Sequence, residues 1–136
     1  MTKAIGFIGI GIMGSHIASH LVKKYKSIHI MGRSSKKTKK FISEHKDKLF
    51  VYDRLDNLAN NCNYIITCVG NDKDLRSVFL SKNGIHNGVR SGTFIIDHTT
   101  ASPEISKVLF KKFVKKGSYF FDAPVSGGEV GAELGK

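Results

Sequence analysis

The sequence predicts an α/β fold built on a doubly wound, mainly parallel sheet. Short apolar runs alternate along the chain with segments of helical periodicity, and turn-forming residues separate the two kinds of segment. The apolar runs are nearly continuous, as is typical of parallel strands that helices cover on both faces. With 136 residues, 40% hydrophobic and 24% charged, the chain is expected to form one domain over residues 1–136.

The first half begins with a predicted strand over 3–9, of sequence KAIGFIG. A helix is expected over about 12–25, because Met13, Ile17 and Leu21 recur at helical spacing. Then come a strand over 27–31, a lysine-rich helix over 35–45 and a short strand over 49–52.

The second half repeats the alternation, with predicted strands over 64–69, 93–97 and 118–122. Ser102 and Pro103 mark a helix start, as an N-cap residue followed by a proline at the first helical position. The apolar positions of the two intervening helices are Leu75, Val78 and Phe79, and then Ile105, Leu109 and Phe113.

The segment GFIGIGIMG, residues 6–14, carries the pattern G-x-G-x-x-G between the first strand and the first helix. In this setting Gly9 permits a tight turn, Gly11 lets a pyrophosphate approach the backbone, and Gly14 lets helix and strand pack closely. The amides of Ile12 and Met13 then begin the helix and face the phosphates. A Rossmann-type dinucleotide site is predicted; the alternative is a glycine-rich turn without a ligand.

Cofactor choice is expected to depend on the end of the second strand, which continues as Met31-Gly32-Arg33-Ser34-Ser35-Lys36-Lys37. An NAD-preferring site has a carboxylate here for the ribose hydroxyls, and this chain has none before Glu44. Arg33 can stack on adenine or pair with a 2′-phosphate, and Ser34 can donate a hydrogen bond to that phosphate, so NADP is preferred over NAD. A solvated basic helix start would explain the lysines but not the missing carboxylate.

Near the other end, the segment 122–132 (DAPVSGGEVGA) is predicted to be a strand end that runs into a flexible loop. Ser126 and nearby backbone amides in such a loop suit a carboxylate or hydroxyl ligand at the carboxyl edge of the sheet. A plain glycine-rich turn is the alternative.

Together these segments resemble the β-hydroxyacid dehydrogenases, the 3-hydroxyisobutyrate dehydrogenase-like family, over essentially the whole chain. DAPVSGG followed by Gly131 and Ala132 is more similar to the hydroxyisobutyrate branch than to 6-phosphogluconate dehydrogenases, whose loop lacks the Asp-Ala-Pro lead-in. The matching segments, in order, are GFIGIGIMGSHIASHL, CVGND at 68–72, DHTTASP at 97–103 and DAPVSGG.

The resemblance implies an enzyme that transfers hydride between NADP(H) or NAD(H) and a small 3-hydroxy acid or its semialdehyde. Gly70 departs from the proline found in many members of the family. Carried over by position, Val69, Gly70, Asn71 and Asp74 line the cofactor, Thr99 or Thr100 lies near the nicotinamide, and Ser126, Gly127 and Gly128 hold the substrate.

The resemblance also implies parts that this chain does not contain. The family's catalytic lysine lies downstream of the serine loop, beyond Lys136, so no catalytic residue is assigned here. The family's C-terminal helical domain is likewise absent. We expect a homo-oligomer in the full-length form, and an isolated chain that binds cofactor but hardly turns over. The alternative is a catalytically incompetent fragment or a nucleotide-sensing module.

The remaining features exclude other classes of function. Cys62 and Cys68 have no disulfide or zinc spacing and are expected to be reduced and buried. His16 and His20 lie one helical turn apart but have no third ligand, so no metal site is expected. The net charge of +11 is spread over solvated lysines, which disfavours a nucleic-acid partner. No membrane span or signal peptide is expected, which points to the cytoplasm, or the mitochondrial matrix in a eukaryote.

Overall fold

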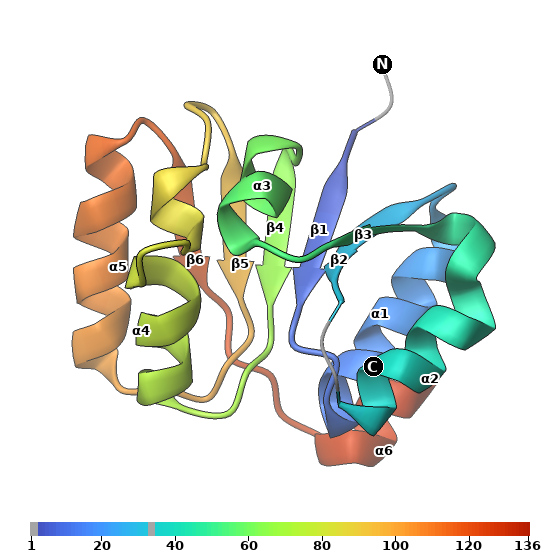
Figure 1. Cartoon of the computed structure of the whole chain (residues 1–136). Helices are drawn as coiled ribbons and strands as arrows, with labels where there is room; N and C mark the ends of the chain where they lie inside the picture. The colour runs from blue at the N-terminus through green and yellow to red at the C-terminus, as the bar shows by residue number, and fades with distance from the viewer. Residues whose placement is uncertain (1–2, 33–34) are drawn as a thin grey trace.

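The computed structural model describes residues 3–32 and 35–136, and its centre is one parallel sheet (Figure 1). The six strands have the order β3-β2-β1-β4-β5-β6, and every neighbouring pair is parallel. This confirms the predicted doubly wound fold. The strands are β1 (Ile5–Ile8), β2 (Ile28–Met31), β3 (Leu49–Tyr52), β4 (Tyr64–Thr67), β5 (Phe94–Asp97) and β6 (Tyr119–Asp122).

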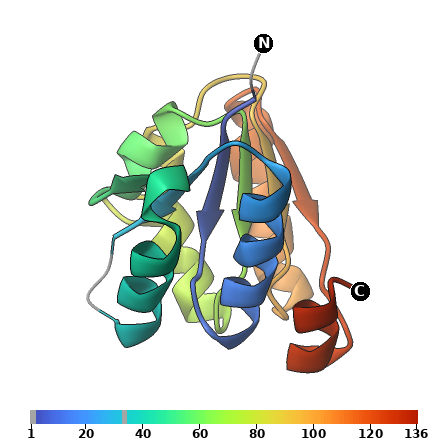
Figure 2. The same ribbon diagram turned by 90° about the vertical axis from the view of Figure 1, so that its right-hand side faces the viewer.

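Helices cover the two faces of the sheet (Figures 1 and 2). Their buried side chains form two separate hydrophobic cores with the strands. One core joins β1 and β2 to the first two helices around Phe7, Ile30 and Phe41. The other joins β4, β5 and β6 to the next three helices around Phe79 and Phe113. The helices are α1 (Ile12–Lys24), α2 (Lys36–His45), α3 (Leu55–Asn60), α4 (Asp72–Leu80), α5 (Pro103–Lys115) and α6 (Gly128–Leu134), with short 3-10 turns at Lys46–Lys48 and Ile85–Asn87.

Two helices were not predicted from the sequence. Helix α3 has six residues, too few to show a helical period, and it buries Leu55 and Leu58. Helix α6 replaces part of the flexible loop expected over 122–132, so that prediction was wrong from Gly128 onward. Two glycines within α6 lower its intrinsic helix propensity, and its packing against α1 supplies the stability that propensity does not.

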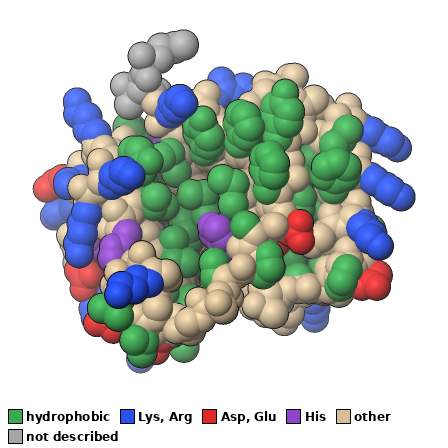
Figure 3. Space-filling view, turned by 180° about the vertical axis from the view of Figure 1, so that it is seen from behind, with side chains coloured by type: hydrophobic (Ala, Val, Ile, Leu, Met, Phe, Trp, Pro, Cys, Tyr) green, Lys and Arg blue, Asp and Glu red, His purple; other side chains and the backbone are tan. Residues whose placement is uncertain are grey.

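One face of the sheet carries an exposed aromatic row. Tyr64, Phe94 and Tyr119 are register neighbours on β4, β5 and β6, and their rings stack with centroids 5.4 and 4.8 Å apart. Phe121 lies on the same face, with its ring stacked against Phe94 at 6.3 Å. Because side chains alternate along a strand, α5 covers only the opposite face, and Tyr119 is 52% exposed. Figure 3 shows hydrophobic side chains gathered on this back face.

Both cysteines are free, in agreement with the sequence. Cys62 is buried beside Gly6 of β1, and burial raises the pKa of its thiol to about 12. Cys68 is half-buried after β4, and burial also raises its pKa. Neither thiol is therefore ionised at neutral pH.

We expect His29 on β2 to make the folding stability depend on pH. Its ring stacks on Phe50 with centroids 4.7 Å apart, and Nδ1 lies 2.7 Å from the Tyr52 hydroxyl. Burial lowers the pKa of His29 below its usual 6.5, so the unfolded chain binds a proton that the folded chain resists. The stabilisation is complete above about pH 6.5 and is lost as the pH falls below it.

We therefore expect the free energy of unfolding of the wild type to fall between about pH 6.5 and 5, and His29→Phe to show a smaller slope there. Phe keeps the stacking on Phe50 but cannot bind a proton. Urea titrations at a series of pH values measure both slopes. Equal slopes would show that His29 does not cause the dependence.

Candidate functional site

The first glycine loop joins β1 to α1 and leaves no room for side chains at two positions. Gly9 has φ +112°, in the left-handed region, and a Cβ there would overlap the carbonyl oxygen of Cys68. A Cβ on Gly14 would overlap the carbonyl oxygen of Gly9. A Cβ on Gly11 would meet no atom within 4 Å. Gly9 and Gly14 thus shape the turn, whereas Gly11 keeps open a space outside it.

Helix α1 begins at this open space. Its N-cap is Gly11, which offers no side-chain hydrogen bond, and its first turn contains no acidic residue. The first amides of a helix have no intrahelical acceptor and carry partial positive charge. The amides that begin at Ile12 are therefore available to an anionic group such as a pyrophosphate.

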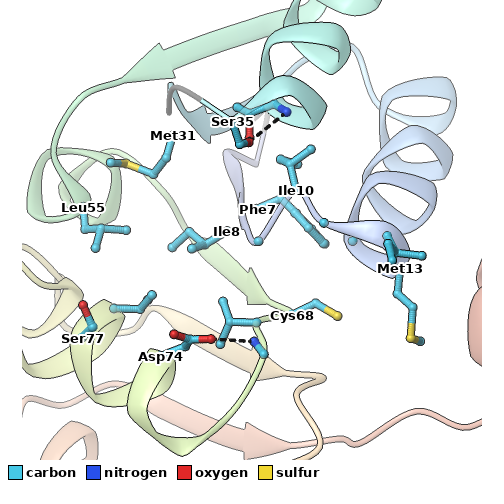
Figure 4. Close-up of a pocket in the computed structure, with 18 residues that line it drawn as sticks. Phe7, Ile8, Ile10, Met13, Met31, Ser35, Leu55, Cys68, Asp74 and Ser77 are labelled. Atoms are coloured by element: carbon cyan, nitrogen blue, oxygen red, sulfur yellow. Dashed lines mark hydrogen bonds between the residues drawn. The ribbon is translucent and has the colours of Figure 1, made fainter.

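A cavity of about 500 Å³ lies in front of these amides, at the carboxyl end of β1, β2 and β4 (Figure 4). Eight of the residues that the sequence assigned to the cofactor line it: Gly9, Gly11, Ile12, Met13, Gly14, Val69, Gly70 and Asp74. The structure thus brings the glycine loop and the loop after β4 to one cavity.

One end of the cavity is formed by Met31 and by the start of α2. Ser35 caps α2, with its hydroxyl accepting from the Thr38 amide at 3.2 Å, and both residues line the cavity. Sequence reasoning missed these two, although the N-cap pattern at Ser35 was visible. Arg33 and Ser34, which were expected to bind the adenosine ribose and its 2′-phosphate, lie outside the described residues. The other lining residues missed by the sequence are Phe7, Ile8, Ile10, Leu55, Cys68, Ser77 and Val78.

The opposite side of the cavity is the loop between β4 and α4. The Gly70 amide donates to Asp74 Oδ2 at 3.2 Å (Figure 4). The Asp74 amide donates to Asn71 Oδ1 at 2.9 Å. Asn71 therefore caps α4 and does not line the cavity. A proline at position 70 would have no N–H for Asp74, so this chain's glycine suits its own carboxylate.

Thr99 and Thr100, the expected nicotinamide contacts, do not line this cavity. Thr100 is exposed, whereas Thr99 is only 5% exposed and its hydroxyl accepts from the Val69 amide at 3.0 Å. Asp97, at the end of β5, is 1% exposed and accepts from the Thr67 hydroxyl at 2.7 Å and the Thr99 amide at 3.1 Å. The end of β5 is thus hydrogen-bonded to the end of β4.

A second cavity, of about 410 Å³, lies between α1, α6 and the segment after β6. Ser126 and Gly128, two of the three residues assigned to substrate, line it, whereas Gly127 does not. Met13 lines both cavities, so the two are neighbours at this residue. His20, His98 and Lys136 also line the second cavity, and none of its described lining residues is acidic.

Histidines hold the segment that carries Ser126 at both ends. His98 Nδ1 lies 2.7 Å from the Ala123 carbonyl oxygen, just after β6. His20 Nε2 lies 3.0 and 2.9 Å from the carbonyl oxygens of Ala132 and Glu133, at the end of α6. His16, one turn earlier on α1, lies 3.4 Å from the Glu129 carboxylate. His16 and His20 thus dock α6, a role that helical spacing alone did not reveal.

The sequence profile of the NAD binding domain of 6-phosphogluconate dehydrogenase matches residues 4–136. The chain belongs to this family. It is 37% identical over 131 residues to an uncharacterized oxidoreductase of Shewanella frigidimarina, covering 96% of this chain and 44% of that protein. It is 36% identical over 131 residues to the mitochondrial 3-hydroxyisobutyrate dehydrogenase of Drosophila melanogaster, covering 96% and 39%.

Solved structures of other proteins share this fold. The structure of Psf3 in complex with NADP+ and 2-OPP superposes with a TM-score of 0.86 and 25% identity, over 96% of this chain and 45% of that one. The chain therefore spans less than half the length of the relatives that it matches. The resemblance to 3-hydroxyisobutyrate dehydrogenases inferred from the motifs is confirmed. Among the described residues, no helix is long and apolar enough to cross a membrane.

Proposed function

We propose that residues 1–136 form the NAD(P)-binding domain of an oxidoreductase of the 3-hydroxyisobutyrate dehydrogenase type. The observation that carries the proposal is the cavity at the uncapped N-terminus of α1, where Gly11 leaves an open space. The α1 amides would bind the pyrophosphate, and Val69 and Gly70 would cover the other side. A relative with 36% identity bears the name 3-hydroxyisobutyrate dehydrogenase, which supports the substrate class.

We infer a preference for NADP over NAD. No described residue that lines the β2 end of the cavity is acidic, and the one lining carboxylate, Asp74, lies across the cavity on α4 (Figure 4). Ser35, the N-cap of α2, lines this end, and Lys36 and Lys37 are the first two residues of the helix. A 2′-phosphate bound there would lie close to positive charge and hydroxyl groups. We assign its direct contacts to Arg33 and Ser34.

The second cavity is the proposed site of a small 3-hydroxy acid. Its lining includes the Ser126 hydroxyl and the rings of His20 and His98, and these polar groups suit a carboxylate. The bound cofactor supplies or accepts the hydride. The residues of this chain would position the two ligands in neighbouring cavities that share Met13.

Cofactor titrations test the proposal. NADPH is expected to bind the 136-residue chain at least about tenfold more tightly than NADH, and Arg33→Ala to weaken NADPH binding by about tenfold to a hundredfold while changing NADH little. The control is Lys116→Ala, which removes one positive charge at the end of α5, outside the cavity lining. Equal losses for both cofactors would contradict the 2′-phosphate assignment, and binding of neither would contradict the cofactor site.

A further inference from the structure

The loop after β4, Cys68–Asn71, lies against the cofactor cavity and is held by the segment after β5. We propose that Thr99 and Asp72 are positioning residues for this loop: they fix the backbone that faces the cofactor without touching the cofactor themselves. The inference rests on the proposed function, because it assigns a role in binding NADPH at that cavity.

The first hydrogen bond that holds the loop, here called the first tie, is made by Thr99. Its hydroxyl accepts from the Val69 amide at 3.0 Å, while the Val69 side chain lines the cavity. Thr99 is itself buried and does not line the cavity. A backbone amide of the loop is thereby fixed by a side chain that lies outside the cavity lining.

Asp97 makes this tie rigid. One of its carboxylate oxygens accepts both from the Thr67 hydroxyl and from the Thr99 amide. Thr67 and Asp97 are register partners at the ends of β4 and β5, and the His98 amide donates to the Thr67 carbonyl oxygen at 2.8 Å. Thr99 therefore has a fixed position relative to the strand from which the loop emerges.

The second tie lies at the far end of the loop. Asp72 is the first residue of α4, and its carboxylate accepts from the Ser102 amide at 2.9 Å and from the Ser102 hydroxyl at 2.5 Å. Ser102 is in turn the N-cap of α5, through its bond to the Ile105 amide at 3.3 Å. The loop after β4 is thus hydrogen-bonded to the segment after β5 at both of its ends.

Two ties at the ends of a short loop reduce the number of conformations that it samples before a ligand arrives. A preformed loop loses less conformational entropy when it binds, so its affinity is higher than that of a mobile loop with the same contacts. This gives the segment 97–102 a function in binding although none of its residues lines the cofactor cavity.

The test compares the NADPH affinity of the wild-type 136-residue chain with the affinities of a matched pair of substitutions at Thr99 and of one substitution at Asp72. Thr99→Val removes the hydroxyl at nearly constant volume and is expected to weaken NADPH binding by about tenfold, whereas Thr99→Ser keeps the hydroxyl and is expected to stay within about twofold of wild type. Asp72→Ala is expected to weaken binding by about threefold. Hydrogen exchange of the Val69 amide is expected to accelerate in Thr99→Val and not in Thr99→Ser.

A stability control separates positioning from general loosening. Ser118→Ala removes a buried hydroxyl that bonds to the Phe113 carbonyl at 3.2 Å, at the opposite end of the sheet, and is expected to leave NADPH affinity unchanged. Wild-type affinity in Thr99→Val, or equal losses in Thr99→Ser or Ser118→Ala, would overturn the inference. Failure of the wild type to bind NADPH would instead refute the proposed function.

Discussion

Gly11→Ala is expected to leave the fold intact and to weaken NADPH binding by about a hundredfold or more. The added methyl group meets no protein atom within 4 Å, so it costs the folded chain little. The same group would occupy the space through which a pyrophosphate reaches the amides of α1. Thermal unfolding and NADPH titration of the same preparation measure the two effects.

Gly14→Ala is the matched control in the same loop. Its methyl group would overlap the Gly9 carbonyl oxygen, so α1 must move away from β1, which costs about 3 kcal/mol of folding stability. The pair separates a glycine kept for the ligand from a glycine kept for packing. Unchanged affinity in Gly11→Ala would rule out the pyrophosphate position proposed here.

Asp97→Ala is expected to lower the free energy of unfolding by about 3 kcal/mol. It leaves the Thr67 hydroxyl and the Thr99 amide without their acceptor in a site that is only 1% exposed. Asp97→Asn keeps a side-chain oxygen for both donors and is expected to cost less. Urea-induced unfolding measures both losses.

Asp122→Asn is the control for this pair, because Asp122 is the register partner of Asp97 on β6 but is exposed. We expect it to change stability by less than about 0.5 kcal/mol. A loss in Asp97→Ala no larger than that of Asp122→Asn would show that the carboxylate of Asp97 does not support the fold.

Much of the architecture was predictable because local pattern and tertiary environment agree. The run around Phe7 is apolar because helices cover both faces of β1. Helix α5 begins where the sequence predicts, with Ser102 as N-cap and Pro103 as the first helical residue. The glycine pattern indicated the cavity because close backbone approach requires both glycines: Gly14 faces the Gly9 carbonyl oxygen in the same loop, and Gly9 faces the Cys68 carbonyl oxygen after β4.

The remainder depends on contacts between distant segments. Helix α6 contains weak helix formers and is docked by His20, more than a hundred residues earlier in the chain. Thr99 belongs to a motif that indicated the right region, but only the register of β4 and β5 determines that its hydroxyl meets the Val69 amide. Periodicity and spacing do not contain that information.

The aromatic row on the back of the sheet also determines how the protein can be observed. The chain has no tryptophan and four tyrosines, so its intrinsic ultraviolet emission comes from tyrosine alone. Two of the four, Tyr64 and Tyr119, flank Phe94 on the uncovered face. Half of the emitting side chains therefore report on that face. Their fluorescence is expected to change when a molecule binds there, so binding can be followed without a label and without tryptophan emission.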